Sequence, residues 1–219
     1  MAYYAGVDLG ATNVRAMVGD GDGTVVGRDR RVTPQGPSGI GAGVCVDGHV
    51  LSGWDGNAGE VGHATLDPAG EMACGCGGVG HWEAYCSGNS IPRYARHLHN
   101  GGPTELPLES PEFSAADVFA AADADPLADR TLERVTEFNA LGVAALVHAY
   151  APIVVYVGGA VALNNPEFVV ESLRERVPEH VMANVPEIEL TTLGDDVVVR
   201  GALASAMTGG TGDRRRLGR

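Results

Sequence analysis

Lysine is absent from the sequence. All fifteen basic side chains are arginine, and 28 aspartates and glutamates outnumber them, which leaves a formal net charge of −13. Such an acidic surface keeps chains hydrated and apart in a high-salt cytoplasm, so we expect a halophilic protein. An acidic protein from a GC-rich genome, which favours Arg, Ala and Gly, is the alternative. With either origin, the negative field repels a phosphate backbone, and nucleic-acid binding is not expected.

Long apolar runs are also missing. No stretch of about 18 apolar residues occurs, so no membrane span is expected. The opening MAYYAGVDLG shows no basic segment followed by an apolar one, so we expect no signal peptide and a cytoplasmic location. Cysteine is scarce, and metal binding and burial explain the four cysteines better than a disulfide framework does: Cys45, Cys74, Cys76 and Cys86.

The segment from Glu60 to Glu83 combines metal-ligating residues with glycines. It contains four candidate ligands: His63, Cys74, Cys76 and His81. Cysteines one residue apart form a mutual disulfide only with difficulty, but both can point at one ion. Four nitrogen and sulfur ligands in a compact loop are typical of a closed tetrahedral zinc site, and the flanking carboxylates would be well held for gripping hydroxyl groups. A glycine-rich surface loop with incidental cysteines is the alternative.

The order of expected elements indicates an α/β protein. Strands come first, at 3–9, 14–20 and 24–32, followed by a β-like segment at 40–53 with a hairpin turn at 47–48. Helical patterns then alternate with apolar strands. The expected helices are 81–98, broken near Gly88 and reopened at Pro92, then 114–124, 127–150 and 167–177. The expected strands are a buried parallel one at 152–159 and another at 189–194, before a last piece at 197–207.

Three glycine-rich turns follow expected strands. They are Asp8-Leu9-Gly10-Ala11-Thr12, the segment 38–43, and Gly158-Gly159-Ala160. A carboxylate at a strand end can hold Mg²⁺, while threonine and backbone N–H groups face phosphate oxygens. Each turn alone is more often structural, but the three together with the metal segment point to nucleotide binding.

These motifs, in this order, resemble the ROK family of sugar kinases and repressors, and within it the glucokinases. The matching segments are VDLGATN at 7–13, GIGAGVCVDG at 39–48, AGEVGH at 58–63, CGCGGVGHWE at 74–83, SG at 87–88, VVYVGGAV at 154–161 and RGALASA at 200–206. The resemblance implies an actin-like ATPase (ribonuclease H-like) fold of two lobes. It also implies transfer of a phosphoryl group from ATP to a hexose, with glucose as the favoured substrate, in a homodimer or homotetramer.

The resemblance also implies roles for individual residues. ATP and Mg²⁺ would be contacted by Asp8, Gly10, Thr12, Gly39, Gly41, Gly158 and Gly159. The sugar hydroxyls would be held by Glu60, His63 and Glu83. Zinc would be held by His63, Cys74, Cys76 and His81.

Two departures from the family pattern stand out. The family usually has a third cysteine where this chain has His81, which is also a good zinc ligand. The segment that carries the family's Asn-Asp pair, whose Asp is the catalytic base, is missing, so the catalytic residue is unknown. We interpret this as an internal deletion joining two blocks near Pro37 and Ser38. Asp47, in a turn, and Asp55 are the nearest substitutes.

The deletion sets the expected domain organisation. Residues 1–37 would be a remnant of the N-terminal lobe, 38–210 a largely complete C-terminal lobe, and 211–219 a disordered tail. It also leaves an alternative to a kinase, namely a non-catalytic sugar- and zinc-binding pseudokinase. A ROK-type repressor is disfavoured, because the chain starts close to its first strand and is strongly acidic.

Overall fold

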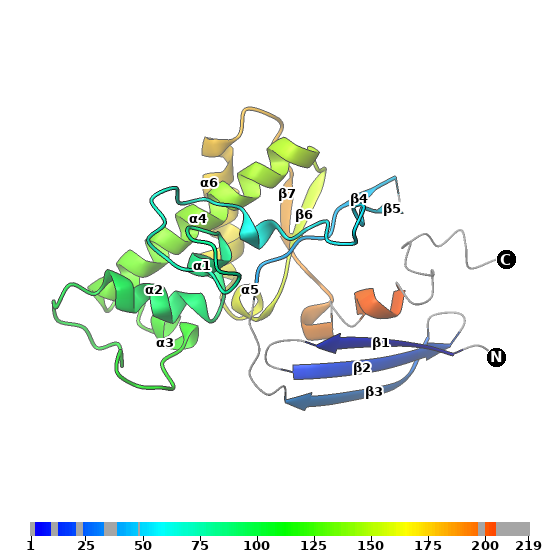
Figure 1. Cartoon of the computed structure of the whole chain (residues 1–219), viewed down its shortest axis with the longest axis horizontal. Coiled ribbons are helices and arrows are strands. Elements are labelled where there is room, and N and C mark those ends of the chain that lie inside the picture. Colours follow the sequence, from blue (N-terminus) through cyan, green and yellow to red (C-terminus); the bar gives the residue numbers. More distant parts are fainter. Residues whose placement is uncertain are drawn as a thin grey trace. The chain divides into compact units, whose positions relative to one another are not determined.

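Figure 1 shows the computed structural model of the chain, which describes residues 3–9, 13–20, 24–32, 39–47, 49–196 and 200–204. These residues form two compact units. The first contains the described residues before 33 together with 42–59 and those from 193 onward, and the second contains 39–41 and 60–192. The two units therefore interleave along the chain, and the organisation expected from the sequence, 1–37, 38–210 and 211–219, stays a prediction. None of the described helices is long and apolar enough to cross a membrane.

The first unit is built from short antiparallel pairings. Strands β1 (Tyr3–Leu9), β2 (Asn13–Asp20) and β3 (Val25–Val32) form a sheet in that order, with a register shift at Val18/Gly19. The three predicted strands are thus confirmed to within one residue. The β-like segment predicted at 40–53 is strand only at β4 (Cys45–Val46) and β5 (His49–Val50), which pair as a hairpin.

The second unit is mainly helical. Its helices are α1 (Glu83–Cys86), α2 (Ser90–Leu98), α3 (Ala115–Ala120), α4 (Pro126–Tyr150), α5 (Ala160–Asn164) and α6 (Ser172–His180). Two four-residue strands, β6 (Val154–Val157) and β7 (Glu187–Leu190), pair in parallel. Helix α4 is the longest element, and α1, α2, α3 and α6 all contact it (Figure 1).

Helix α4 begins and ends for identifiable local reasons. The carboxylate of Asp125 accepts hydrogen bonds from the N–H groups of Leu127 (2.8 Å) and Ala128 (3.1 Å), which have no partner within the helix. Pro126 occupies the first turn, where its missing N–H costs nothing. The helix ends at Tyr150 and is capped by Ala151, which adopts a left-handed conformation with φ of 44°. The helix predicted over 127–150 is confirmed.

An aromatic cluster joins α1 and α2 to α4. The rings of Tyr85 and Phe138 stack with centroids 4.3 Å apart, and Tyr94 meets Tyr85 edge-on at 5.0 Å. Trp82 lies against the α4 backbone, where its Nε1 donates a 2.9 Å hydrogen bond to Asn139. These contacts fix the position of α1 and of the residues just before it.

Several predicted elements differ in the structure. The break near Gly88 is confirmed, but α2 starts at Ser90 rather than Pro92. The helix predicted at 114–124 is confirmed with its Ser114 cap but ends at Ala120, and that predicted at 167–177 is a π-helical turn, Glu167–Glu171, continued by α6. Strand β7 lies earlier than the predicted 189–194, and α5 was not predicted.

Strand β6 pairs in parallel as predicted, but its expected burial is wrong. Tyr156 is 62% exposed and the valines beside it are only partly buried. Within the described residues the sheet of β6 has two strands. Of the piece predicted at 197–207, residues 200–204 are helical, and the predicted tail at 211–219 lies outside the described residues.

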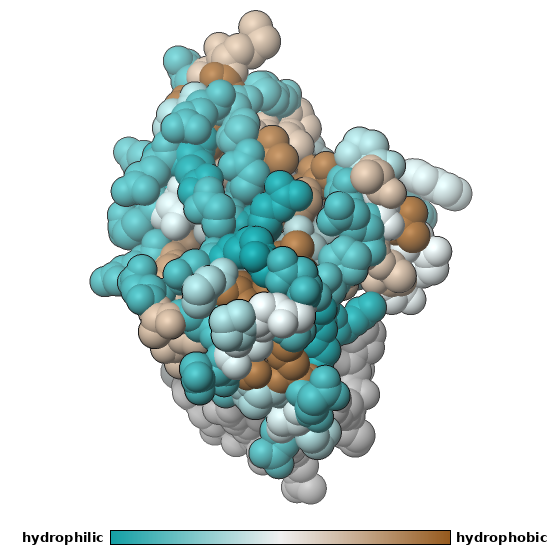
Figure 2. Space-filling view, turned by 90° about the vertical axis from the view of Figure 1, so that its left-hand side faces the viewer, coloured by the Kyte–Doolittle hydropathy of each residue, from teal (hydrophilic) through white to brown (hydrophobic). Residues whose placement is uncertain are grey.

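The surface that faces left in Figure 1, on the side of α2 and α3, is mostly hydrophilic. Figure 2 shows this face, on which apolar residues appear only in small groups between hydrophilic ones. Such a surface is expected for a chain with a net charge of −13.

Candidate sugar and metal site

The segment from Glu60 to Glu83 has little regular structure and is held by short pairings. A 3-10 turn, Val61–His63, opens it, and isolated bridges join Thr65 to His81 and Ala73 to Val79. Gly80 is a required glycine: its φ is +70°, and a Cβ there would lie 1.9 Å from the carbonyl oxygen of Asp67. The loop is therefore folded tightly enough to bring its two ends together.

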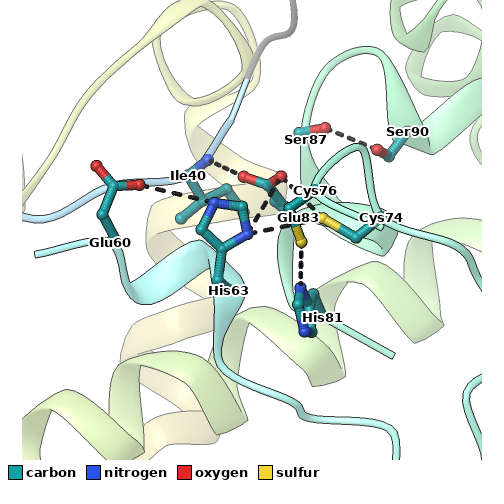
Figure 3. A network of polar contacts seen from close by, with 9 residues as sticks. All are labelled: Ile40, Glu60, His63, Cys74, Cys76, His81, Glu83, Ser87 and Ser90. Atoms are coloured by element: carbon teal, nitrogen blue, oxygen red, sulfur yellow. Dashed lines mark hydrogen bonds and ion pairs between the residues drawn. The ribbon is translucent and has the colours of Figure 1, made fainter. Parts of the chain in front are cut away.

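The four predicted zinc ligands converge in this loop. Nδ1 of His63 lies 3.7 Å from Sγ of Cys74, and Sγ of Cys76 lies 3.3 Å from Nδ1 of His81 (Figure 3). All four ligand atoms are within 4.8 Å of one another. Zinc bonds of about 2.0–2.3 Å give tetrahedral edges of about 3.3–3.8 Å, so both distances suit ligands of one zinc ion. The residues present fit the metal that the sequence implies.

The thiol of Cys74 illustrates what a cation would change. Burial raises its pKa to about 11, and the neighbouring carboxylate of Glu83 adds to the rise. Sγ lies 3.1 Å from Oε1 of Glu83, a suitable distance for a neutral thiol to donate a hydrogen bond. A divalent cation reverses this preference, because its charge stabilises the thiolate.

The residues expected to hold the sugar surround the imidazole of His63. Oε1 of Glu83 lies 3.7 Å from Nδ1, on the ligand side of the ring, and Oε2 of Glu60 lies 3.7 Å from Nε2, on the other side (Figure 3). The side chain of Glu83 is 16% exposed and that of Glu60 is 66% exposed. One carboxylate is therefore fixed within the protein and the other is open to solvent.

The expected second phosphate loop contacts the same carboxylate. The N–H of Ile40 donates a 3.4 Å hydrogen bond to Oε2 of Glu83. A Cβ at Gly39 would lie 2.8 Å from that oxygen, and a Cβ at Gly62 would lie 2.2 Å from the carbonyl oxygen of Ile40. Glycine at these two positions is what allows 39–41 to approach the sugar residues.

The other expected site residues belong to other elements. Asp8 is the last residue but one of β1, and Gly10 and Thr12 lie outside the described residues. Gly158 and Gly159 follow β6 and lead into α5, with φ of +94° at Gly159. A nucleotide-contacting role for these five positions, and for Gly39 and Gly41, stays a prediction.

Asp47 and Asp55, the two candidate substitutes for the missing base, both have local structural roles. Asp47 lies in the β4–β5 turn with φ of +50°. Asp55 accepts hydrogen bonds from the N–H (3.1 Å) and side-chain amide (3.2 Å) of Asn57, and these bonds lower its pKa. A carboxylate with a lowered pKa is a weak proton acceptor, so Asp55 is poorly suited to serve as a base.

One supporting contact was not predicted from the sequence. The hydroxyl of Tyr85 donates to Oδ2 of Asp67 and accepts a 3.1 Å hydrogen bond from the N–H of Met72. It thereby ties the middle of the loop to α1, two residues after Glu83. Burial, followed by the contact with Asp67, raises the pKa of Tyr85, so the phenol stays protonated and able to donate. No sequence motif marks this pair.

Comparison of the sequence with known proteins identifies the family to which the chain belongs. The sequence profile of the ROK family matches residues 36–208. This chain belongs to the ROK family. It is 37% identical over 170 residues to the glucokinase of Pyrobaculum calidifontis, covering 77% of this chain and 54% of that protein. It is 40% identical over 182 residues to the glucokinase of Aeropyrum pernix, covering 77% of this chain and 56% of that one.

Solved structures of ROK proteins confirm the fold. The ROK family glucokinase from Streptomyces griseus, in complex with glucose and AMPPNP, superposes with a TM-score of 0.76 at 19% identity, covering 94% of this chain and 99% of that one. The predicted α/β, actin-like ATPase fold is thus confirmed. The chain spans about half the length of the curated relatives it matches.

Proposed function

We propose that this chain is a ROK-type sugar kinase lobe that binds a hexose against Glu60, His63 and Glu83. Glucose is the favoured hexose. The proposed reaction is transfer of a phosphoryl group from ATP to the sugar 6-hydroxyl. The observation that carries the proposal is the arrangement around His63, which has a carboxylate on each side of its ring and the candidate metal ligands beyond Nδ1. Closely spaced acceptors and a donor are what hydroxyl recognition needs.

Each side chain has a distinct part in this proposal. The carboxylates of Glu60 and Glu83 accept hydrogen bonds from sugar hydroxyls, and Nε2 of His63 donates one. If Nδ1 of His63 is a zinc ligand, its proton resides on Nε2 and the ring cannot rotate. Bound zinc would supply a structural cross-link between His63, Cys74, Cys76 and His81, which fixes the loop that carries all three sugar residues.

The nucleotide part of the proposal is supported by the loop at 39–41. We assign ATP and Mg²⁺ to the backbone and side chains of Asp8, Gly10, Thr12, Gly39, Gly41, Gly158 and Gly159. The hydrogen bond from Ile40 to Glu83 joins the expected phosphate loop to the sugar residues within one compact unit. Phosphoryl transfer depends mostly on such positioning, because the phosphate and the attacking hydroxyl must be held in line.

A second candidate function is a non-catalytic pseudokinase that binds sugar and zinc. The observation that favours it is that the 219 residues contain no Asn-Asp dipeptide, the pair that carries the base in the resembling family. The family profile begins to match at residue 36, beside the proposed junction of Pro37 and Ser38. Loss of a positioned base costs about 10²–10⁴-fold in rate, so any turnover should be slow.

Two measurements separate these functions. A coupled assay with ATP and glucose on the zinc-loaded chain, with Asp8→Ala as control, tests catalysis. Calorimetry with glucose alone tests binding. Turnover above the control supports the kinase, and glucose binding without turnover supports the pseudokinase. Absence of both would refute sugar recognition at this site. The expected cytoplasmic location, homodimer or homotetramer and halophilic character stay predictions.

A further inference from the structure

Gly78 faces the ring of His81 across the cysteine-containing turn. A Cβ atom at residue 78 would lie 2.4 Å from Cε1 of His81 and 2.7 Å from Nε2, closer than the 3.0 Å below which real Cβ atoms are essentially never found. The φ of Gly78 is not in the left-handed region, so the backbone itself would accept alanine. The three heavy atoms nearest to such a Cβ all belong to the imidazole of His81, so this ring is what requires glycine here.

The ring of His81 has little freedom to move away. Its Nδ1 lies 3.3 Å from Sγ of Cys76, and its backbone pairs with Thr65. The ring of His63 meets it edge-on, with centroids 5.6 Å apart. Rotation to relieve a clash with residue 78 would take Nδ1 out of the ligand cluster.

The neighbouring glycines have different reasons to be glycine. Gly77 has φ of +93°, which strains any other residue. Gly75 lies between the two cysteines and has no positive φ, and a Cβ there would have no described atom within 4 Å. Gly75 is therefore a matched control for Gly78, since the two share one turn but only Gly78 meets the imidazole.

We propose that Gly78 is a positioning residue whose missing side chain lets His81 bind the metal through Nδ1, so that positions 78 and 81 work as a pair. This inference rests on the proposed zinc site. It gives a centre of two thiolates and two neutral imidazoles, whose charges sum to zero with Zn²⁺. With a third cysteine at residue 81, the same ion would carry a net negative charge beside Glu83, whose Oε1 is 3.1 Å from Sγ of Cys74.

The test is a double-mutant cycle on the full chain, read as zinc affinity by competition with a chromophoric chelator. The variants are Gly78→Ala, Gly75→Ala, His81→Cys and the double variant Gly78→Ala/His81→Cys. Gly78→Ala should weaken zinc binding about 10- to 100-fold, the range typical when the surroundings that orient a metal ligand are disturbed. Gly75→Ala should stay within about twofold, and Gly78→Ala should cost no more than about twofold in the His81→Cys background.

Cobalt absorption provides a readout independent of activity. Co²⁺-loaded wild-type chain should show thiolate charge-transfer bands for two sulfurs, and His81→Cys should strengthen them by about half, in proportion to a third thiolate. The proposed pairing of positions 78 and 81 would be overturned, and the zinc site left standing, by either of two results. One is an equal loss of zinc affinity from Gly78→Ala in the wild-type and His81→Cys backgrounds. The other is equal zinc affinity of Gly78→Ala and Gly75→Ala. Failure of the wild-type chain to bind either metal would overturn both.

Discussion

Single side chains around His63 carry the proposed recognition, and the most buried of them is Glu83. Its two oxygens contact Cys74, His63 and the N–H of Ile40, so it cannot swing toward a ligand without cost. The more exposed Glu60 lies 3.7 Å from Nε2 of His63. At the scale of residues, Glu83 is thus the fixed point on which the sugar site is built.

Glu83→Gln should weaken glucose binding by about tenfold or more, because a charged acceptor is replaced by a neutral amide that donates at one position. Glu112→Gln is the matched control, since Glu112 is an exposed acid in the 101–113 loop. Calorimetry with glucose measures both. Equal affinity in the two variants would contradict a role for Glu83 in binding the sugar.

Helix α4 supports α1, the short helix that begins at Glu83 and packs against it, and the ends of α4 depend on particular side chains. Asp125 is 2% exposed and accepts hydrogen bonds from Thr104 and Glu105 as well as from the helix N-terminus. Burial opposes ionisation of this carboxyl, but the hydrogen bonds outweigh it and hold its pKa below the usual range for aspartate. The cap therefore couples helix stability to pH.

Asp125→Asn should lower the free energy of unfolding by about 1–3 kcal/mol at neutral pH. Because the folded-state pKa lies below the unfolded one, the carboxylate's contribution is complete above about pH 4 and is lost as the pH falls through the folded pKa. The difference in free energy of unfolding between wild type and variant, measured by urea denaturation, should therefore shrink from pH 6 to pH 2. A gap that stays constant over this range would show that ionisation of Asp125 does not stabilise the fold.

Gly142→Ala tests the contact between α4 and Trp82. Helix propensity alone predicts that this change stabilises by about 1 kcal/mol. A Cβ at residue 142 would, however, lie 2.5 Å from the indole of Trp82, so we expect destabilisation by about 1–3 kcal/mol. The sign of the change in the urea midpoint distinguishes the two outcomes, and stabilisation would refute close packing of Trp82.

Elements differ in how well the sequence predicted them. The apolar repeat of α4 and the hairpin strands β1 to β3 follow from local periodicity, and both are confirmed. Helix α5 has only five residues, too short for a periodic signal, and the start of β7 depends on pairing with β6. The contacts of Tyr85 with Asp67 and of Gly78 with His81 depend on how the loop folds back, which no local pattern encodes.

At the scale of the whole molecule, motif order predicted more than composition did. The motifs identified the ROK family, and the profile match and the structural neighbours confirm that family and its fold. Convergence of the four candidate ligands was predicted from spacing and agrees with the structure, whereas metal binding itself is a proposal. The internal deletion also remains a proposal, supported by a family match that starts at residue 36.

The central claim is that one metal ion cross-links the loop between His63 and His81 and thereby holds the sugar-binding carboxylates. The most direct test combines elemental analysis of the purified chain with glucose calorimetry before and after treatment with a strong chelator. We predict one zinc ion per chain, and loss of glucose binding on chelation that added zinc restores. Purified chain without stoichiometric metal, or glucose binding that survives complete metal removal, would contradict the account.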